Sequence, residues 1–463
     1  MKKLLYILAL SSITLSSCSK FLEIDIPADK VTSDYIFSTK ETAEAATVGM
    51  YSKSMGSGIN YFNGITTLTT GMLAGEILPT NLTTLTPFVN NDMRADLSYV
   101  SLMWSGPYQT IYHCNLLIEK LGQADKLTSD VKQRLIAEVK FFRALHYFYL
   151  VNIYGEVPLA LTSDYRTNAT LPKSKVEDVY ASIISDLEFA EATLTDDYNS
   201  PERIRANKWA AKALLARVHL YLEHWKEAEQ YSSEVIGHTA QYNLVPSVNS
   251  AFLNNSTTNN NKEAIFQLAY QTGQSVSCYE GVLFLESNND DVPDYYINPK
   301  LVSVLTSDPK DERKNWIDTY PARDGTIYKY LYKYKVYGSF TTPKKEHLTL
   351  LRLGEQYLIL AEALAHQGKL TEANDNIDFI RLRAKVDPLK GNGITYTQAQ
   401  VLDLVMNERQ KELCFELGHR WFDLNRTGRA AAYFATFPEK QWQPTDRYFP
   451  IPADEASKNP FLK

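Results

Sequence analysis

Residues 207–236 read NKWAAKALLARVHLYLEHWKEAEQYSSEVI, and residues 351–383 read LRLGEQYLILAEALAHQGKLTEANDNIDFIRLR. In each stretch, apolar residues recur at helical spacing on both sides of a short break, and Gly368 lies in the second break. A spacing of three to four residues places apolar side chains on one face of a helix. We therefore predict that each stretch forms two helices joined by a tight turn.

Small residues recur at the same interval in both stretches. Ala216 and Ala228 are twelve residues apart, and so are Ala361 and Ala373. Small side chains at these positions let the two helices of a hairpin approach closely, as in tetratricopeptide repeats. The alternative is that the helices are unrelated amphipathic helices rich in alanine. The equal spacing of the two alanine pairs disfavours this alternative. Weaker helical pairs are predicted around residues 138–194 and 398–432.

The predicted fold class is mostly α: a scaffold of tetratricopeptide-like helix pairs with a smaller, mixed region rich in loops. Single helices are predicted at residues 41–55 and 104–121. Residues 56–104, rich in Thr, Asn and Gly, are predicted as irregular loop. Residues 240–345 are predicted as a mixed insertion with a strand at 264–270 and another at 328–337. The lysines of the second strand, Lys329, Lys333 and Lys335, are expected on an exposed face.

The composition and charge of the chain limit its function class. Its 463 residues include 48 Lys and Arg against 54 Asp and Glu, a formal net charge of -6. This balance excludes the strongly basic surface expected of a nucleic-acid-binding protein. With 44% hydrophobic and 22% charged residues, the chain has the ordinary mix of a globular protein with a packed core.

The first residues have the pattern of an export signal. Lys2 and Lys3 precede an apolar run from residue 4 to 15, and small residues then lead to Cys18. The run is about 12 residues long, whereas a helix needs roughly 20 apolar residues to span the hydrocarbon core of a membrane. The small residues before Cys18 resemble a bacterial lipobox, in which the cysteine is lipidated. The alternative is an ordinary secretory signal with a chance cysteine.

The N-terminal pattern sets the predicted domain boundaries. Residues 1–17 are a lipoprotein signal peptide, residues 18–26 a lipidated tether, and residues 27–463 a single body. The other cysteines, Cys114, Cys278 and Cys414, are far apart and lack metal-ligand spacing. We expect buried thiols, with one long-range disulfide as the alternative.

Several short blocks occur from end to end of the chain. They are EVKFFRA at 138–144, YGEVP at 154–158, AAKALLAR at 210–217, ERQKEL at 408–413, GHRWFDL at 418–424 and PIP at 450–452. In this order, and together with the lipobox, the blocks resemble the SusD/RagB family of outer-membrane nutrient-binding lipoproteins of Bacteroidetes. Two departures are a chain shorter than many relatives and Leu417 where relatives often have an aromatic residue.

The resemblance implies four tetratricopeptide-like helix pairs with the ligand site on loops opposite them. It also implies a SusC-like TonB-dependent transporter as partner, docked through the helical side, and a lipid-anchored position at the cell surface on the outer membrane. Family ligands are commonly oligosaccharides, and some members bind peptides.

A sugar site combines aromatic rings, which stack on the C–H faces of pyranoses, with amide and guanidinium groups for hydroxyls. Loops are expected to supply these groups because the helices are committed to packing. The candidate residues are Tyr61, Phe62, Asn63, Asn90, Asn91, Arg94, Trp104, Tyr279, Tyr295, Tyr296 and Trp316. The alternative for each ring is that it pins its loop to the scaffold. Trp209, Trp225 and Trp421 are assigned to the helical core.

The remaining polar residues in apolar helical frames are predicted to be structural. They are Arg143, Arg217, Arg381 and Arg420, expected to pair with carboxylates, and His146, His219 and His419, expected in the core. No H-E-x-x-H, G-x-S-x-G or P-loop pattern occurs. The sequence therefore predicts no enzyme activity and no cofactor, with a structural cation left open. The predicted function is oligosaccharide capture; a peptide-binding RagB-like protein and an adaptor without ligand are the alternatives.

Overall fold

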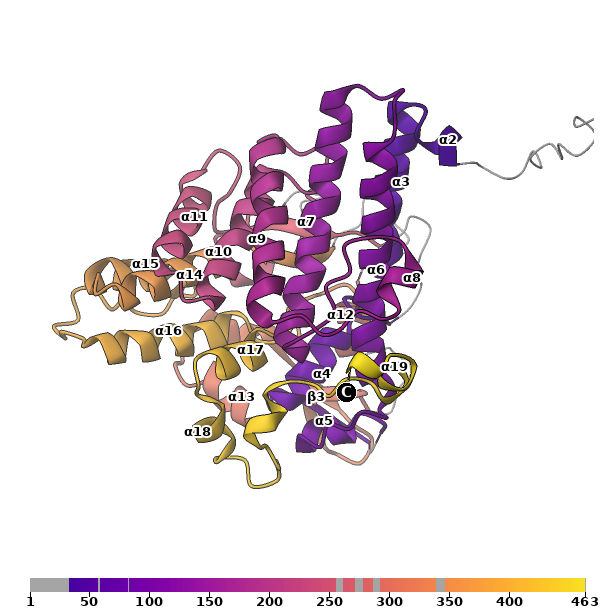
Figure 1. Ribbon diagram of the computed structural model, residues 1–463. Coiled ribbons are helices and arrows are strands. Elements are labelled where there is room, and N and C mark those ends of the chain that lie inside the picture. Colours follow the sequence, from indigo (N-terminus) through magenta and orange to yellow (C-terminus); the bar gives the residue numbers. More distant parts are fainter. Residues whose placement is uncertain are drawn as a thin grey trace, which may run out of the picture.

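The computed structural model describes residues 33–56, 59–81, 83–254, 261–270, 278–285, 292–338 and 346–462. The predicted signal peptide, residues 1–17, and the predicted tether, residues 18–26 with Cys18, lie outside the described residues. In the described chain, helices form most of the body and strands are short (Figure 1). The predicted fold class, mostly α, is confirmed.

Four long helices form one half of the body: α3 (Lys40–Met55), α6 (Ser98–Gly122), α7 (Ser129–Tyr154) and α9 (Val176–Thr193). They lie side by side in Figure 1, where α7 packs against both α6 and α9. Helix α7 is buried around most of its circumference, with Phe141, Phe142 and Tyr147 among the large side chains enclosed by its neighbours. A helix that is apolar all round must lie in the centre of a core.

The two stretches with matching alanines form the predicted hairpins. The first contains α10 (Lys208–Tyr221) and α11 (Trp225–Gly237), and the second contains α14 (Leu353–His366) and α15 (Leu370–Arg383). Ala216, Ala228, Ala361 and Ala373 are all fully buried, as expected of small residues at a close helix crossing. Gly368 has a φ of +76°, a left-handed turn conformation that favours glycine.

The hairpins continue into one another. Helix α11 packs against α14, and both α14 and α15 pack against α16 (Gln398–Glu412), which is followed by α17 (His419–Arg426). Short helices complete the described chain: α2 (Ser33–Ile36), α4 (Ile65–Leu73), α5 (Thr86–Asn90), α8 (Tyr165–Asn168), α12 (Tyr279–Phe284), α13 (Pro299–Leu305), α18 (Ala430–Phe434) and α19 (Ala453–Lys458).

Strands of the described residues pair antiparallel, two at a time. The pairs are β1 (Ile77–Pro79) with β3 (Tyr295–Ile297), β2 (Ala264–Leu268) with β6 (Leu348–Arg352), and β4 (Ile317–Pro321) with β5 (Ile327–Leu331). The mixed character predicted for residues 240–345 and the strand predicted at 264–270 are thus observed. The strand predicted at 328–337 is shorter, because it ends at Leu331 and the chain then turns inward.

The irregular loop predicted for residues 56–104 is wrong in its central part. Helix α4, strand β1 and helix α5 lie there, and every residue from 61 to 77 is buried. The threonines of α4 make this burial feasible because their hydroxyls bond to backbone carbonyls of the preceding turn. Thr69 Oγ1 donates to the Ile65 carbonyl at 2.8 Å, and Thr66 Oγ1 donates to the Tyr61 carbonyl at 2.7 Å.

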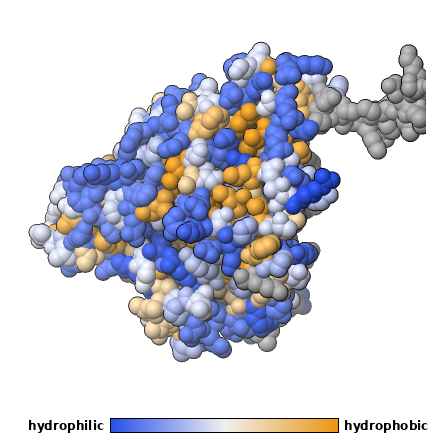
Figure 2. Space-filling view, viewed as in Figure 1, coloured by the Kyte–Doolittle hydropathy of each residue, from blue (hydrophilic) through white to orange (hydrophobic). Residues whose placement is uncertain are grey.

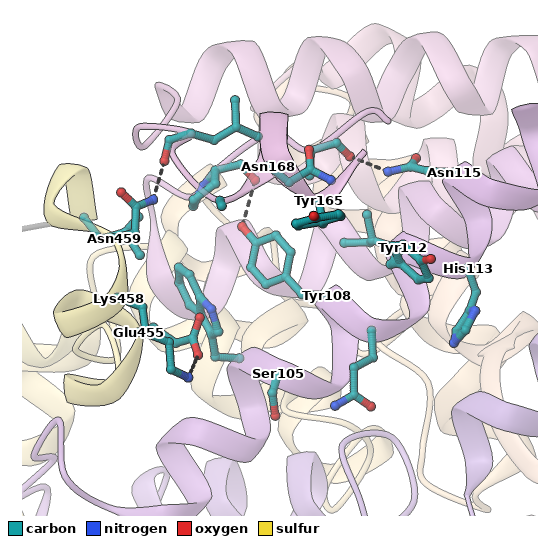
Figure 3. Close-up of a pocket in the computed structure, with 18 residues that line it drawn as sticks. Ser105, Tyr108, Tyr112, His113, Asn115, Tyr165, Asn168, Glu455, Lys458 and Asn459 are labelled. Atoms are coloured by element: carbon teal, nitrogen blue, oxygen red, sulfur yellow. Dashed lines mark hydrogen bonds and ion pairs between the residues drawn. The ribbon is translucent and has the colours of Figure 1, made fainter. Parts of the chain in front are cut away.

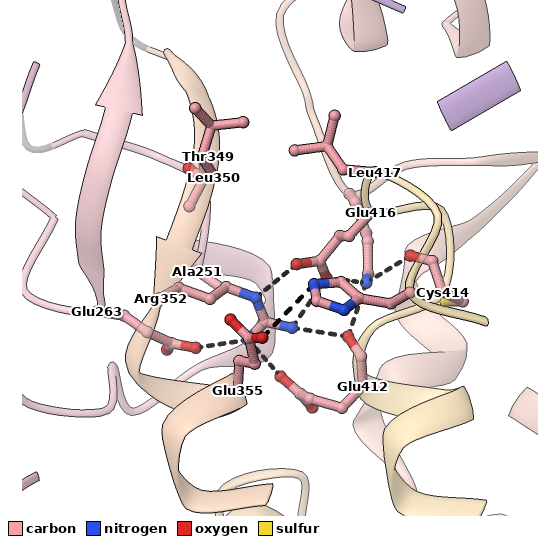
Figure 4. A network of polar contacts seen from close by, with 12 residues as sticks. Ala251, Glu263, Thr349, Leu350, Arg352, Glu355, Glu412, Cys414, Glu416 and Leu417 are labelled. Atoms are coloured by element: carbon pink, nitrogen blue, oxygen red, sulfur yellow. Dashed lines mark hydrogen bonds and ion pairs between the residues drawn. The ribbon is translucent and has the colours of Figure 1, made fainter. Parts of the chain in front are cut away.

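A buried network of charges joins the strands to the helical hairpins (Figure 4). Arg352, where β6 passes into α14, contacts Glu412 at 2.8 Å, Glu416 at 2.7 Å and Glu263 at 2.9 Å. Lys333, expected on an exposed face, is instead buried and donates to Glu416 Oε1 at 2.6 Å. Burial alone would raise the pKa of Glu412, but Arg383, Arg352 and Arg313 hold it well below its usual value.

Two of the arginines predicted to be structural form buried ion pairs. Arg143 Nε lies 2.7 Å from Asp186, and Arg217 lies 2.6 Å from Glu355. Arg381 lies 3.7 Å from Glu408 and also donates to the Asp387 carbonyl. The predicted pairing with carboxylates is thus confirmed for Arg143, Arg217 and Arg381, whereas Arg420 lies 4.6 Å from the centre of the Tyr433 ring.

The predicted core histidines, cysteines and tryptophans are mostly buried. His146, His219 and His419 lie in the core, and burial lowers the pKa of His146 to about 3. Cys114, Cys278 and Cys414 are free, buried thiols. Trp421 is buried, whereas Trp209 and Trp225 are half-buried and stack on His238 and His366.

Candidate ligand-binding site

Six of the candidate site residues are buried, and their prediction as accessible loop groups is wrong. They are Tyr61, Phe62, Asn63, Asn91, Trp104 and Trp316. Tyr61 and Phe62 pack against Tyr149 of α7, so both rings serve the scaffold. The physical reason is that α4 and the residues before it are part of the core rather than of a surface loop.

Trp316 is fully enclosed and presents no ring face to a ligand. Its indole Nε1 donates to the Val248 carbonyl at 3.2 Å, and the ammonium group of Lys333 lies 4.2 Å from its ring centre. The ring therefore anchors the start of β4 to the body. Trp104 is almost as deeply buried and packs edge-on against Tyr154, with ring centres 4.9 Å apart.

The two buried asparagines position neighbouring segments. Asn63 Nδ2 donates to the Met55 carbonyl, and its Oδ1 accepts from the backbone N–H of Tyr279 at 3.3 Å. Asn91 has a φ of +58°, and its Oδ1 accepts from Lys440 Nζ at 3.0 Å. Lys440 also donates to the Val89 carbonyl at 2.6 Å, so one amino group caps the C-terminal end of α5 by hydrogen bonding.

Five candidates remain accessible: Asn90, Arg94, Tyr279, Tyr295 and Tyr296. Arg94 is exposed and pairs with Asp92 at 2.9 Å and Asp96 at 3.4 Å. Tyr295 and Tyr296 lie on β3, and Tyr279 begins α12. Burial raises the pKa of Tyr295 to about 12, an effect to which nearby Tyr99 adds. The Tyr295 hydroxyl is therefore protonated and able to donate hydrogen bonds at neutral pH.

Tyr296 belongs to a group of three half-buried rings, which we name the tyrosine platform: Tyr296, Tyr320 and Tyr328. The rings of Tyr296 and Tyr328 have centres 5.4 Å apart, and β3 lies beside β5. Tyr320 of β4 is directly opposite Tyr328 of β5, where paired side chains are about 5 Å apart. The rings of Tyr296 and Tyr328 meet edge to face, with an angle of 68° between their planes. Three rings from two separate segments thus form one group that spans at most about 10 Å.

The sequence prediction missed Tyr320 and Tyr328. A usable signal was present, because Asp324-Gly325 lies midway between them and such a dipeptide between aromatic runs is typical of a β-hairpin. The contact with Tyr296 had no local signal, since it joins segments more than twenty residues apart.

Comparison with known proteins identifies the family. A family model described as "SusD family" matches residues 161–463, and one described as "Starch-binding associating with outer membrane" matches residues 20–220. The chain belongs to the SusD family. The resemblance predicted from the sequence blocks is therefore confirmed.

Relatives in the SusD family match either almost the full chain or part of it. SusD-like protein P25 of Formosa agariphila is 24% identical over 96% of this chain and 95% of its own length. The starch-binding protein SusD of Bacteroides thetaiotaomicron is 28% identical over 36% of this chain and 30% of its own length.

Solved SusD-like structures share the fold. A SusD superfamily protein from Parabacteroides distasonis has a TM-score of 0.78 and 26% identity, covering 94% of this chain and 99% of its own. A structure named "Laminarin binding SusD-like protein" has a TM-score of 0.72 and 23% identity, covering 90% and 97%.

The described residues contain neither a metal-binding cluster nor a helix suited to span a membrane. Among them, no cluster of three or more His, Cys, Asp or Glu side chains has a metal-binding arrangement. None of the helices in this part of the chain combines the length and apolar character that a membrane span requires.

A buried carboxyl group lies beneath the ligand-side segments. Glu280 of α12 accepts from Thr67 Oγ1 at 3.2 Å, and burial raises its pKa to about 7. Because the folded pKa exceeds the unfolded value of about 4.5, folding favours the protonated form. Below pH 4.5 the contribution of Glu280 to the free energy of unfolding has its full value. This contribution falls by about 3 kcal/mol as the pH rises to about 7, and it is constant at higher pH.

A Glu280→Gln variant is therefore expected to be more stable than the wild type at pH 8 and nearly equal to it at pH 4. The neutral amide keeps the shape of the side chain and its acceptor for Thr67. Urea unfolding of both proteins at the two pH values measures the effect. Glu76 is also buried with a pKa raised to about 7, so the comparison is made between the two proteins at each pH. A stability difference that does not change with pH would contradict this account.

Proposed function

We propose that this SusD-family protein binds an oligosaccharide on the tyrosine platform and releases it, chemically unchanged, to a SusC-like TonB-dependent transporter. A lipid on Cys18 anchors the protein to the outer membrane with its body at the cell surface. Family membership supports the ligand class, because matching families and relatives are described as binding starch, laminarin or carbohydrate.

The geometry of the tyrosine platform is the observation that carries the proposal. Half-buried tyrosine rings are held firmly by their neighbours while part of each ring stays open to a ligand. The C–H faces of pyranoses stack on such rings, and the hydroxyl at the ring edge bonds to sugar hydroxyls. A span of roughly 10 Å suits consecutive sugars of a chain better than a single monosaccharide.

Charged groups beside the rings suit the same ligand. Asp318 is exposed and lies two residues from Tyr320, which places both side chains on one face of β4. A carboxylate accepts hydrogen bonds from vicinal sugar hydroxyls. Asp318 Oδ1 already accepts from the backbone N–H of Thr319 at 2.8 Å, and an exposed carboxylate has capacity for further hydrogen bonds. The combination of rings and this acceptor supports sugar binding over simple packing.

A binding screen on the chain without residues 1–17 tests the proposed function. Isothermal calorimetry with a glycan panel is expected to show saturable binding of at least one oligosaccharide. Incubation with peptide pools, followed by co-purification and mass spectrometry, is expected to recover no peptide. Peptide capture without glycan binding would favour the RagB-like alternative. Absence of both signals would favour the adaptor, and either result contradicts the proposal.

A further inference from the structure

A groove lies outside the tyrosine platform and shares none of its residues. Its walls are α6, the segment 158–171 that carries α8, and the C-terminal segment with α19 (Figure 3). Its volume is about 580 Å³, within the range of roughly 300–1,000 Å³ that is usual for small-molecule sites. Figure 2 shows that hydrophobic residues gather on this face between α7 and α6, next to hydrophilic residues over α8.

Aromatic rings line both walls of this groove. Trp104, Tyr108 and Tyr112 recur every four residues on α6 and so occupy one face of the helix. Tyr165 stands on the opposite wall (Figure 3). Tyr112 is 42% exposed and Tyr165 is 70% exposed, although each is a large ring next to an apolar cavity. Rings left this open are available for stacking.

Hydrogen bonds hold the groove in its open shape. Tyr108 Oη donates to the Pro158 carbonyl at 2.7 Å, and Asn115 Nδ2 donates to the Ala160 carbonyl at 2.9 Å. Asn459 Nδ2 donates to the Leu171 carbonyl at 2.8 Å. These bonds join all three walls, so the groove exists before any ligand arrives. A preformed site loses less entropy on binding.

Polar side chains alternate with the rings along the groove. Ser105 and Gln109 lie between the aromatic residues of α6, and Glu455 lines the far end. Asn168 donates to the Thr162 carbonyl, but its Oδ1 is buried with no partner among the described residues. A buried acceptor without a donor is energetically unfavourable, so Asn168 is a polar group of the groove wall with unused hydrogen-bonding capacity.

We infer that this groove is a second saccharide-binding site, which holds another part of a long glycan chain. Its rings match the C–H faces of pyranoses, and its interspersed amide, hydroxyl and carboxylate groups match their hydroxyls. An apolar peptide segment would fit the rings but would make no use of the hydrogen-bonding groups of Ser105 and Gln109. The inference takes its ligand class from the proposed function.

The segment that leads into α6 contacts the C-terminal wall of the groove. The backbone N–H of Ala453, at the start of α19, donates to the Ala95 carbonyl at 2.9 Å, and Ser101 Oγ lies 3.3 Å from Asp454. A polysaccharide that occupies both the groove and the tyrosine platform gains from two sites, so the groove strengthens binding of polymers more than of short oligosaccharides.

The test compares three purified proteins, each lacking residues 1–17, in native gels that contain starch or laminarin. They are the wild type, Tyr112→Ala/Tyr165→Ala, and Tyr337→Ala as a control with a similarly exposed tyrosine. Whichever of the two polysaccharides slows the wild type in the gel is expected to bind the groove variant at least about fivefold more weakly, because two stacking rings are lost. The melting temperature is expected to stay unchanged, because both rings are at the surface. The control is expected to migrate like the wild type.

Three outcomes separate the two claims. Weaker polysaccharide binding by the groove variant, with normal calorimetric affinity for a short oligosaccharide of the same glycan, supports a second site. Equal retardation of the groove variant and the wild type overturns the inference and leaves the proposed function intact. A wild type that binds neither polysaccharide nor any oligosaccharide of the panel overturns the proposed function, and the inference with it.

Discussion

An Arg352→Met variant is expected to lose about 3–5 kcal/mol of unfolding free energy. The guanidinium group of Arg352 is buried and contacts the carboxylates of Glu263, Glu412 and Glu416 within 2.9 Å. Methionine keeps the length of the side chain but removes its charge and all five donors. Buried carboxylates left without this partner pay a desolvation cost that the remaining cations, Arg383 and Lys333, compensate only in part.

Urea unfolding followed by circular dichroism measures this loss. Arg429→Met is the matched control, because Arg429 also forms an ion pair, with Asp403 at 2.6 Å, but both side chains are solvent-exposed. Exposed pairs contribute about 0–1 kcal/mol. If Arg352→Met cost no more than Arg429→Met, the network in Figure 4 would not be what joins strand β6 to the helices.

A Tyr296→Ala/Tyr328→Ala variant is expected to bind the best glycan of the panel roughly 100-fold to 1,000-fold more weakly. A ring at the centre of a binding surface is worth about 2 kcal/mol when it is truncated, and about 1.4 kcal/mol corresponds to a factor of ten. Isothermal calorimetry gives the ratio of the dissociation constants.

Two further variants separate ring stacking from loss of structure. Tyr296→Phe/Tyr328→Phe keeps both rings, so it is expected to retain most of the affinity and lose only the hydroxyl contacts. Tyr337→Ala removes an exposed tyrosine elsewhere and is expected to leave the affinity unchanged. Wild-type affinity in the alanine double variant would remove these rings from the site.

Much of the helical scaffold was predictable because its signals are local. Helix α7 occupies residues 129–154, the range that its apolar periodicity and the following Gly155 and Pro158 indicate. The paired alanines of the two hairpins lie at the helix crossings because a larger side chain there would hold the helices apart. Periodicity and small-residue spacing depend only on neighbours within a few turns.

The ligand side was not predictable to the same degree, because burial there depends on distant residues. Trp316 appears in a polar, irregular stretch, but Val248 and Lys333 enclose it from either side. The threonines of α4 suggest a loop by composition, yet their hydroxyls bond to backbone carbonyls of α4 and the residues before it, or to Glu280. The tyrosine platform joins β3 to the β4–β5 hairpin, which no local pattern could reveal.

The groove was missed for the opposite reason. Tyr108 and Tyr112 follow a helical spacing that is typical of core residues, and helices were assigned to packing alone. The segment 158–171 crosses α6 mostly without regular structure, so it leaves Tyr112 exposed and Tyr108 half-buried. A helix face is core only if another element covers it.

Hydrogen–deuterium exchange of the wild-type protein, with and without a saturating concentration of its best glycan ligand, tests the central claim most directly. The account predicts slower amide exchange on binding in residues 295–297 and 317–331, which carry the tyrosine platform. Saturable glycan binding with unchanged exchange in both segments, and protection confined to other parts of the molecule, would contradict it.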